Sequence, residues 1–113
     1  MLLLTATTDK ISLISSATGD LDVVANFADR DTTTFVVGLM DRQLTNITTA
    51  TTTDIVAAPA SGKARNVKFI NIRNTHASTP MDVTVQVNAN GTLYELIKVT
   101  LAAGEVLQFV EGI

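Results

Sequence analysis

Residues 81–91 read MDVTVQVNANG, and this stretch decides the fold class. Its apolar side chains alternate with polar ones, which is the period-2 pattern of a β-strand with one buried face: Met81, Val83, Val85 and Val87. Asn90 and Gly91 follow, and Asn-Gly is the strongest short-range signal for a β-hairpin because both central residues of a type I′ turn need φ > 0. Alternation resumes over residues 93–101, so we predict a hairpin that places one row of apolar residues in a common core: Val83, Val85, Val87, Leu93, Ile97 and Val99.

Short alternating segments on both sides of this hairpin predict more strands. We expect them at residues 10–13, 21–28, 44–53, 54–57, 65–73 and 106–110, separated by turn clusters. Within 65–73, Val67 and Phe69 share one face but Ile70 and Ile72 share the other, which indicates a β-bulge or a central strand buried on both faces. Seven or eight short strands, with turns roughly every 8–12 residues, are typical of an all-β antiparallel sandwich, Ig-like or jelly-roll-like.

The 113 residues suit one domain with a single core. We expect an N-terminal arm at residues 1–9 and one β-sandwich domain at residues 10–113. The least regular segment is 32–43, where Gly38 interrupts an apolar run and the three threonines at 32–34 disfavour a helix. We interpret it as an excursion between strands, partly buried or docked on a partner.

Composition excludes several classes of function. The chain has no cysteine, which rules out disulfides, thiolate catalysis and Cys-type zinc or iron–sulfur sites. Its net charge of −3 and its lack of a basic run make it a poor general binder of nucleic acid. The apolar start, residues 1–4, is too short for a signal peptide, and no segment approaches the ~20 apolar residues of a membrane span. We therefore expect a non-secreted protein with no nucleic-acid partner and no membrane partner.

No motif carries catalytic chemistry, so we predict no catalytic, cofactor-binding or metal-binding residue. His76, the single histidine, lies in a polar loop and is interpreted as a solvated loop residue, since a general base needs an orienting partner and a nucleophile in reach. Asp20 with Asp22, and Asp29 with Asp31, could each share Ca²⁺, but a calcium site needs roughly 6–8 oxygen ligands, so solvated strand-end charges are favoured. A modest basic cluster is interpreted as outward charge, with salt bridges to an acidic partner as the alternative: Lys63, Arg65, Lys68 and Arg73.

Two long runs resemble a group of small structural proteins of tailed bacteriophages. Residues 48–78 read TTATTTDIVAAPASGKARNVKFINIRNTHAS, and residues 83–112 read VTVQVNANGTLYELIKVTLAAGEVLQFVEG. The shared pattern is a DIVA-x-P loop, an N-x-R-N strand end, a V-x-V strand and an L-x-x-G-E-x-L-x-F-V edge. Residues 35–43, FVVGLMDRQ, depart from the more polar pattern of that group.

The resemblance implies a non-enzymatic β-sandwich subunit of a phage particle. Such a protein is made in the cytoplasm of the host bacterium and assembles into the virion as a homo-oligomer, against the major capsid protein or tail components. The short chain favours a capsid decoration or cement protein that stabilises the head, with a tail, fibre or adaptor subunit as the alternative. A carbohydrate-binding module is a weaker alternative, because sugar platforms use exposed aromatic rings and this chain has no Trp and a single Tyr, Tyr94. An enzymatic function is the weakest of these alternatives.

Two apolar segments fit poorly into a self-contained sandwich. A soluble monomer rarely exposes contiguous apolar patches of more than a few hundred Å² unless they bind something. We therefore predict that both segments lie in contacts between subunits: Met1, Leu2, Leu3 and Leu4 at the start, and Phe35, Val36, Val37, Leu39 and Met40 in the irregular segment. The alternative is that residues 35–40 complete the domain's own core.

Overall fold

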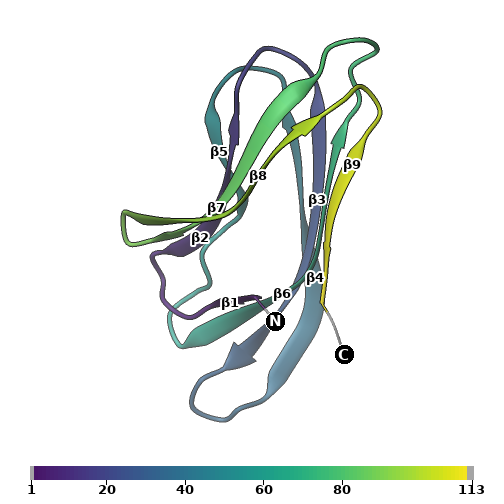
Figure 1. Ribbon diagram of the computed structural model, residues 1–113. Coiled ribbons are helices and arrows are strands. Elements are labelled where there is room, and N and C mark those ends of the chain that lie inside the picture. The colour runs from purple at the N-terminus through teal and green to yellow at the C-terminus, as the bar shows by residue number, and fades with distance from the viewer. Residues whose placement is uncertain (1, 112–113) are drawn as a thin grey trace.

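The computed structural model describes residues 2–111, and this part of the chain is all β (Figure 1). Its strands are β1 (Leu2–Leu4), β2 (Asp9–Ser15), β3 (Leu21–Asp31), β4 (Val37–Ile47), β5 (Thr52–Val56), β6 (Lys63–Asn74), β7 (Met81–Ala89), β8 (Thr92–Leu101) and β9 (Val106–Val110). A five-stranded sheet has the order β1-β6-β3-β4, with β9 also paired to β6, and a four-stranded sheet has the order β5-β2-β7-β8. The two antiparallel sheets pack as a sandwich, so the predicted fold class is confirmed, with nine strands in the described residues instead of seven or eight.

The core lies between the two sheets and is almost entirely aliphatic. Along β3 and the first part of β7, alternate residues are buried, as the period of 2 requires. The side chains that are at most 1% exposed include Leu4, Ile11, Leu13, Leu21, Val23, Ala25, Ile55, Val56, Val67, Ile72, Met81 and Val83. Each Val, Leu, Ile or Met buried in this way contributes roughly 1.5–3 kcal/mol, so these side chains hold the sheets together without disulfides.

The β7–β8 hairpin turns where the sequence predicts it. Ala89 pairs with Thr92, and the two residues between them have positive φ, 51° for Asn90 and 89° for Gly91, as a type I′ turn requires. The Gly91 N–H donates to Asn88 Oδ1 at 2.8 Å. Val83 lies opposite Val99 and Val85 opposite Ile97, so this part of the predicted register is confirmed.

A β-bulge in β8 changes the register beyond Ile97. Val85 pairs with Ile97 and Gln86 with Glu95, which leaves Leu96 as the extra residue. Because one inserted residue reverses the alternation, Tyr94 comes to lie opposite Val87 and Leu93 opposite Asn88. The prediction that Leu93 joins the common row is therefore wrong, and Leu93 is 54% exposed.

Strand β6 is both bulged and central. Phe27 of β3 pairs with Val67, whereas Asn26 pairs with Phe69, so Lys68 is the extra residue. This bulge explains why the inward position shifts from Val67 to Ile70. On its other side β6 pairs with β1 through residues 65–67 and with β9 through residues 69–73.

The N-terminal residues belong to the sandwich. Residues 2–4, expected within an arm at 1–9, form β1 antiparallel to β6, with Leu2 opposite Val67. Leu4 is fully buried, and β2 already begins at Asp9. The segment from residue 2 to residue 9 is therefore a structural part of the domain.

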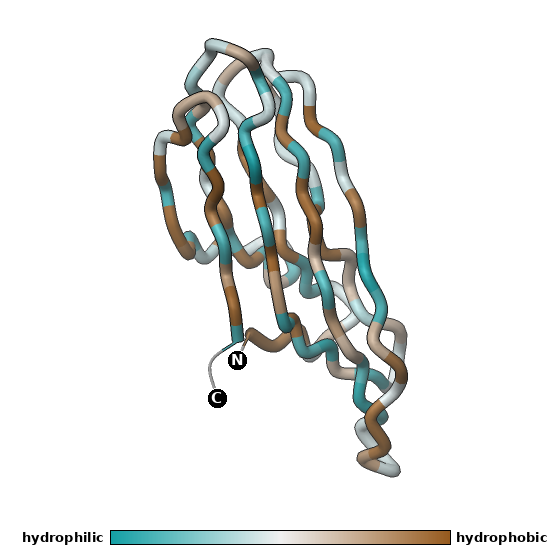
Figure 2. The backbone as a smooth tube through the Cα atoms, turned by 90° about the vertical axis from the view of Figure 1, so that its right-hand side faces the viewer, coloured by the Kyte–Doolittle hydropathy of each residue, from teal (hydrophilic) through white to brown (hydrophobic). Residues whose placement is uncertain are grey.

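The irregular segment 32–43 forms a hairpin rather than an excursion between strands. β3 runs to Asp31, a short turn follows, and β4 begins at Val37 opposite Arg30. Gly38 fits here because a Cβ at this position would lie 3.3 Å from the Asp29 carbonyl oxygen across the ladder. The hairpin projects beyond the rest of the sandwich (Figure 2). The molecule measures 49 × 28 × 21 Å, and its radius of gyration of 14.4 Å exceeds the roughly 13 Å of a compact domain of this length.

Candidate interaction surfaces

Five apolar side chains are exposed at the end of the β3–β4 hairpin, and we call them the hairpin patch: Phe35, Val36, Val37, Leu39 and Met40. Their exposed fractions run from 58% for Met40 to 94% for Leu39, so the core does not contain them. Leu39 and Met40 are consecutive in β4 and so lie on different faces of the hairpin, and summed over both faces the five side chains expose on the order of 300–400 Å² of apolar surface. Patches of this size on a monomer are often functional.

Asp31 holds the tip of this hairpin. Its Oδ1 accepts the backbone N–H groups of Thr33 and Thr34, each at 2.8 Å, and its Oδ2 lies 3.2 Å from Lys63 Nζ. The hydrogen bonds from Thr34 and Thr33, followed by the one from Lys63, hold the pKa of the Asp31 carboxyl well below its usual range. The ionised carboxylate therefore shapes the turn that presents the patch.

Phe35 is displayed in an unfavourable backbone conformation. Its φ is +60°, in the left-handed region that non-glycine residues rarely enter. Its N–H donates to the Asp31 carbonyl at 2.9 Å, and the Arg30 guanidinium carbon lies 5.1 Å from the ring centroid, within cation–π range. The ring is nevertheless 64% exposed. Backbone strain concentrates at functional sites, so the strained, exposed ring supports a contact role for the tip.

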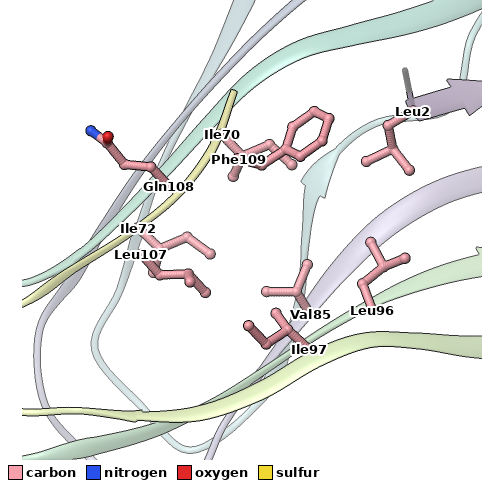
Figure 3. A pocket seen from close by; sticks show the side chains of 9 residues that line it. All are labelled: Leu2, Ile70, Ile72, Val85, Leu96, Ile97, Leu107, Gln108 and Phe109. Atoms are coloured by element: carbon pink, nitrogen blue, oxygen red, sulfur yellow. The ribbon is translucent and has the colours of Figure 1, made fainter. Parts of the chain in front are cut away.

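A second apolar surface opens between β8 and β9, and we call it the edge groove (Figure 3). It encloses a cavity of about 260 Å³. Figure 3 shows Val85, Leu96 and Ile97 on one side of this space and Leu107 and Phe109 on the other. The lining has eight apolar side chains and one polar side chain: Leu2, Ile70, Ile72, Val85, Leu96, Ile97, Leu107, Phe109 and Gln108.

The bulge in β8 builds one wall of the edge groove. Leu96 and Ile97 are consecutive, and in a regular strand they would point to opposite faces. The extra residue of the bulge allows both to line the groove, where they remain 47% and 41% exposed. In the described chain β8 pairs with β7 alone and β9 with β6 alone, so each strand beside the groove has a free backbone edge.

At the opposite long edge of the sandwich, side chains of the five-stranded sheet bond to β5 and the chain beyond it, and Arg65 of β6 donates to the Ala57 carbonyl at 2.7 Å. There β4 lies beside β5, and Gln43 of β4 donates from Nε2 to the Asp54 carbonyl at 3.0 Å and accepts the Ala57 N–H on Oε1 at 2.8 Å. Its amide thus bonds to β5 and to the chain just beyond it, much as a neighbouring strand would. No hydrogen bond joins β8 to β9 within residues 2–111, and Figure 1 shows these two strands leaving their connecting loop in different directions. The sandwich is therefore tied on one long edge and open on the other.

The N-terminal candidates divide among three environments. Leu2 lines the edge groove, Leu3 is 49% exposed and Leu4 is in the core. Met1 lies outside the described residues. Since Leu4 is fully buried, it has no surface left for a partner.

His76 organises its own loop. Its Nδ1 accepts the backbone N–H groups of Ser78 at 3.2 Å and Thr79 at 3.0 Å. The buried side chain of Asn74 adds to this loop, because its Oδ1 accepts the His76 N–H at 3.1 Å and its Nδ2 donates to the Thr79 carbonyl at 2.8 Å. His76 is thus a structural acceptor, and neither a serine hydroxyl nor a carboxylate bonds to its ring in the described chain.

The two aspartate pairs each have protein donors. Asn46 Nδ2 donates to Asp20 Oδ1 at 2.7 Å and to Asp22 Oδ1 at 2.8 Å. The Asp29 carboxylate takes a bidentate contact from Arg65, at 2.8 and 3.0 Å. Within residues 2–111, no three His, Asp or Glu side chains gather closely enough to hold a metal ion.

The basic cluster also bonds mainly within the chain. Lys63 pairs with Asp31, Arg65 with Asp29, and Lys68 with Glu111 at 2.8 Å. The hydrogen bond from Lys68 lowers the pKa of the Glu111 carboxyl and ties the end of β9 to β6. These three basic side chains therefore neutralise the chain's own acids.

No known family matches this chain, and neither a curated protein nor a solved structure is significantly similar to it. No helix in residues 2–111 is long and apolar enough to cross a membrane.

Sequence reasoning identified the hairpin patch but missed the edge groove. Residues 93–101 were expected to contribute regularly to the core, whereas Leu96 and Ile97 line a partly open space. The adjacent pair Leu96-Ile97, which breaks the alternation, was the available signal for a bulge.

Proposed function

We propose that this protein is a non-enzymatic structural subunit of a bacteriophage particle, attached to the head as a decoration or cement protein. The observation that carries the proposal is the hairpin patch, an apolar surface on a projecting and locally strained hairpin. In the described residues the ring of the single histidine accepts only backbone N–H groups of its own loop, so His76 is engaged in structure and gives catalysis no support. The resemblance of residues 48–78 and 83–112 to small virion proteins supports the phage particle as the place where the hairpin patch makes its contact.

The size of the contact favours a subunit that works in many copies. The hairpin patch offers on the order of 300–400 Å², compared with the roughly 800 Å² per partner of a standard stable interface. A single contact of this size is weak. When many copies are arrayed on one surface, the effective concentration makes the summed attachment strong.

The test is to locate the protein on purified phage particles with an antibody raised against the isolated chain. We expect regularly spaced label over the head, in many copies per particle. Label confined to the tail would overturn the head assignment in favour of a tail, fibre or adaptor subunit. Particles free of label, from a lysate that contains the protein, would overturn the proposal as a whole.

A further inference from the structure

We propose that the hairpin patch of one copy docks into the edge groove of a second copy, so that the subunits join head to tail. The inference names the partner of the patch, and it rests on the proposed function only in treating that patch as a subunit contact. Both halves of the contact are present on one chain and are apolar. They lie on different parts of the fold, the tip of β3–β4 and the β8–β9 edge.

The dimensions of the groove suit side chains of the hairpin patch. Its cavity of about 260 Å³ falls below the roughly 300–1,000 Å³ of small-molecule sites. A cavity of about 150 Å³ already accommodates a benzene ring. The groove therefore has room for the exposed Phe35 ring together with an aliphatic neighbour such as Leu39.

A chain cannot fill its own groove. In the five-stranded sheet β4 lies at one edge and β9 borders the opposite edge, with β3 and β6 between them. Three strand spacings of about 4.8 Å place β4 and β9 roughly 14 Å apart, on opposite sides of the sheet. The hairpin tip also projects away from the body (Figure 2). The apolar donor must therefore come from another copy.

Unpaired backbone edges of β4 and β8 also favour contact between the hairpin and the groove. β4 is an edge strand, and Gln43 is the residue that ties it to β5, so residues 37–41 have a free edge in the described chain. β8 has a free edge beside the groove. Free strand edges pair readily with other chains, which gives a docked hairpin main-chain hydrogen bonds in addition to apolar burial.

The predicted contact is heterologous, because the two surfaces differ. Such contacts close into rings or continue as filaments. One contact buries at most about 300–400 Å² of the patch, and less where only one face of the hairpin enters the groove, well under the roughly 800 Å² per partner of a stable dimer. Self-association should therefore appear only at high protein concentration, or where a particle holds the copies close together.

The test uses two pairs of leucines, each pair on one strand. In β4, Leu39 belongs to the hairpin patch, whereas Leu44 is exposed farther along the strand. In β8, Leu96 lines the groove, whereas Leu93 lies opposite Asn88 and outside the groove. Sedimentation velocity at increasing protein concentration measures self-association, which we expect for the wild type. Leu39→Asp and Leu96→Asp should associate at least tenfold more weakly. The controls Leu44→Asp and Leu93→Asp should associate nearly as well as the wild type. Each variant is first shown to be folded by its thermal unfolding.

Mixing the two defective variants gives the decisive result. Leu39→Asp keeps an intact groove and Leu96→Asp keeps an intact hairpin, so an equimolar mixture should form a 1:1 dimer that grows no further. A mixture that stays monomeric would overturn the inference, as would equal loss of association in the control variants. A wild type that is monomeric at every concentration, while label still decorates phage heads, would refute this contact and leave the proposed function standing. If mixing restored association but no label appeared on phage particles, the contact between copies would stand and the proposed function would be refuted.

Discussion

Gly91 occupies the second central position of the β7–β8 turn, with φ +89°. No heavy atom lies within 4 Å of where its Cβ would be, so a substitution here acts through the backbone alone. We predict that Gly91→Val lowers the free energy of unfolding by roughly 1 kcal/mol or more, because a β-branched residue resists positive φ. Urea denaturation measures the change. Gly91→Asn is the control and should lose less, since Asn tolerates this region, and equal losses in both variants would contradict the backbone explanation.

Asp31 makes the hairpin tip sensitive to acid. Hydrogen bonds from Thr34, Thr33 and Lys63 keep the pKa of its carboxyl lower in the folded chain than in the unfolded chain. Its stabilising contribution is therefore fully present above the unfolded-chain pKa of about 3.9, declines as the pH falls from there, and is lost only as the pH passes through the lower folded-state pKa. We predict that the wild-type thermal midpoint exceeds that of Asp31→Asn near neutral pH, and that the difference narrows steadily as the pH falls from about 4 toward 2. The Asp31→Asn variant keeps an oxygen acceptor without the charge, and a difference independent of pH would refute this role of the carboxylate.

Strand β1 is short, yet one of its three residues is in the core. Leu4 is fully buried, whereas Leu3 beside it is 49% exposed. We predict that Leu4→Ala lowers the free energy of unfolding by about 2–5 kcal/mol, the range for a leucine removed from a packed core. Leu3→Ala is the matched control and should change stability by about 0.5 kcal/mol or less. Similar small effects in both variants, measured by urea denaturation, would mean that β1 is dispensable.

The strands differed in how well the sequence revealed them, and the reasons are physical. The β7 strand and its turn were predicted closely because alternation and Asn-Gly are local signals. Segment 32–43 was misinterpreted because its hairpin uses Asp31 side-chain hydrogen bonds and a strained Phe35, and neither follows from local propensity. β1 was misassigned because three residues carry no periodic pattern, and their strand pairing depends on distant residues of β6.

Of the two candidate surfaces, one could be predicted from the sequence and the other could not. The hairpin patch was predicted as an exposed contact because it is a contiguous apolar run. The edge groove required knowledge of which strands end up at the sandwich edge and of the extra residue in β8. The position of a strand at the edge is set by long-range pairing, which a single sequence does not reveal, whereas the adjacent Leu96 and Ile97 were a local signal of the bulge.

The whole molecule is asymmetric in how its two sheets are joined at their long edges. On the β4–β5 side Gln43 makes two hydrogen bonds between sheets, at 3.0 and 2.8 Å. On the β8–β9 side the space between sheets is an apolar groove, where Gln108 bonds to Asn71 of its own sheet at 2.7 Å. The two sheets are therefore hydrogen-bonded to each other along one edge and separated by an apolar groove along the other.

This asymmetry predicts that two glutamines on edge strands differ in their effect on stability. Gln43→Ala removes a donor and an acceptor that join the sheets, and because water can reach the exposed Asp54 carbonyl and Ala57 N–H, we expect only the net loss of two hydrogen bonds, about 1 kcal/mol in the free energy of unfolding. Gln108→Ala removes one exposed hydrogen bond within a sheet and should change stability by about 0.5 kcal/mol or less. Urea denaturation at low protein concentration, where the copies are separate, makes the comparison. If Gln108→Ala lowered stability more than Gln43→Ala, the β8–β9 edge would contribute to the stability of the isolated subunit. That result would argue against an edge groove that is free to bind a second copy.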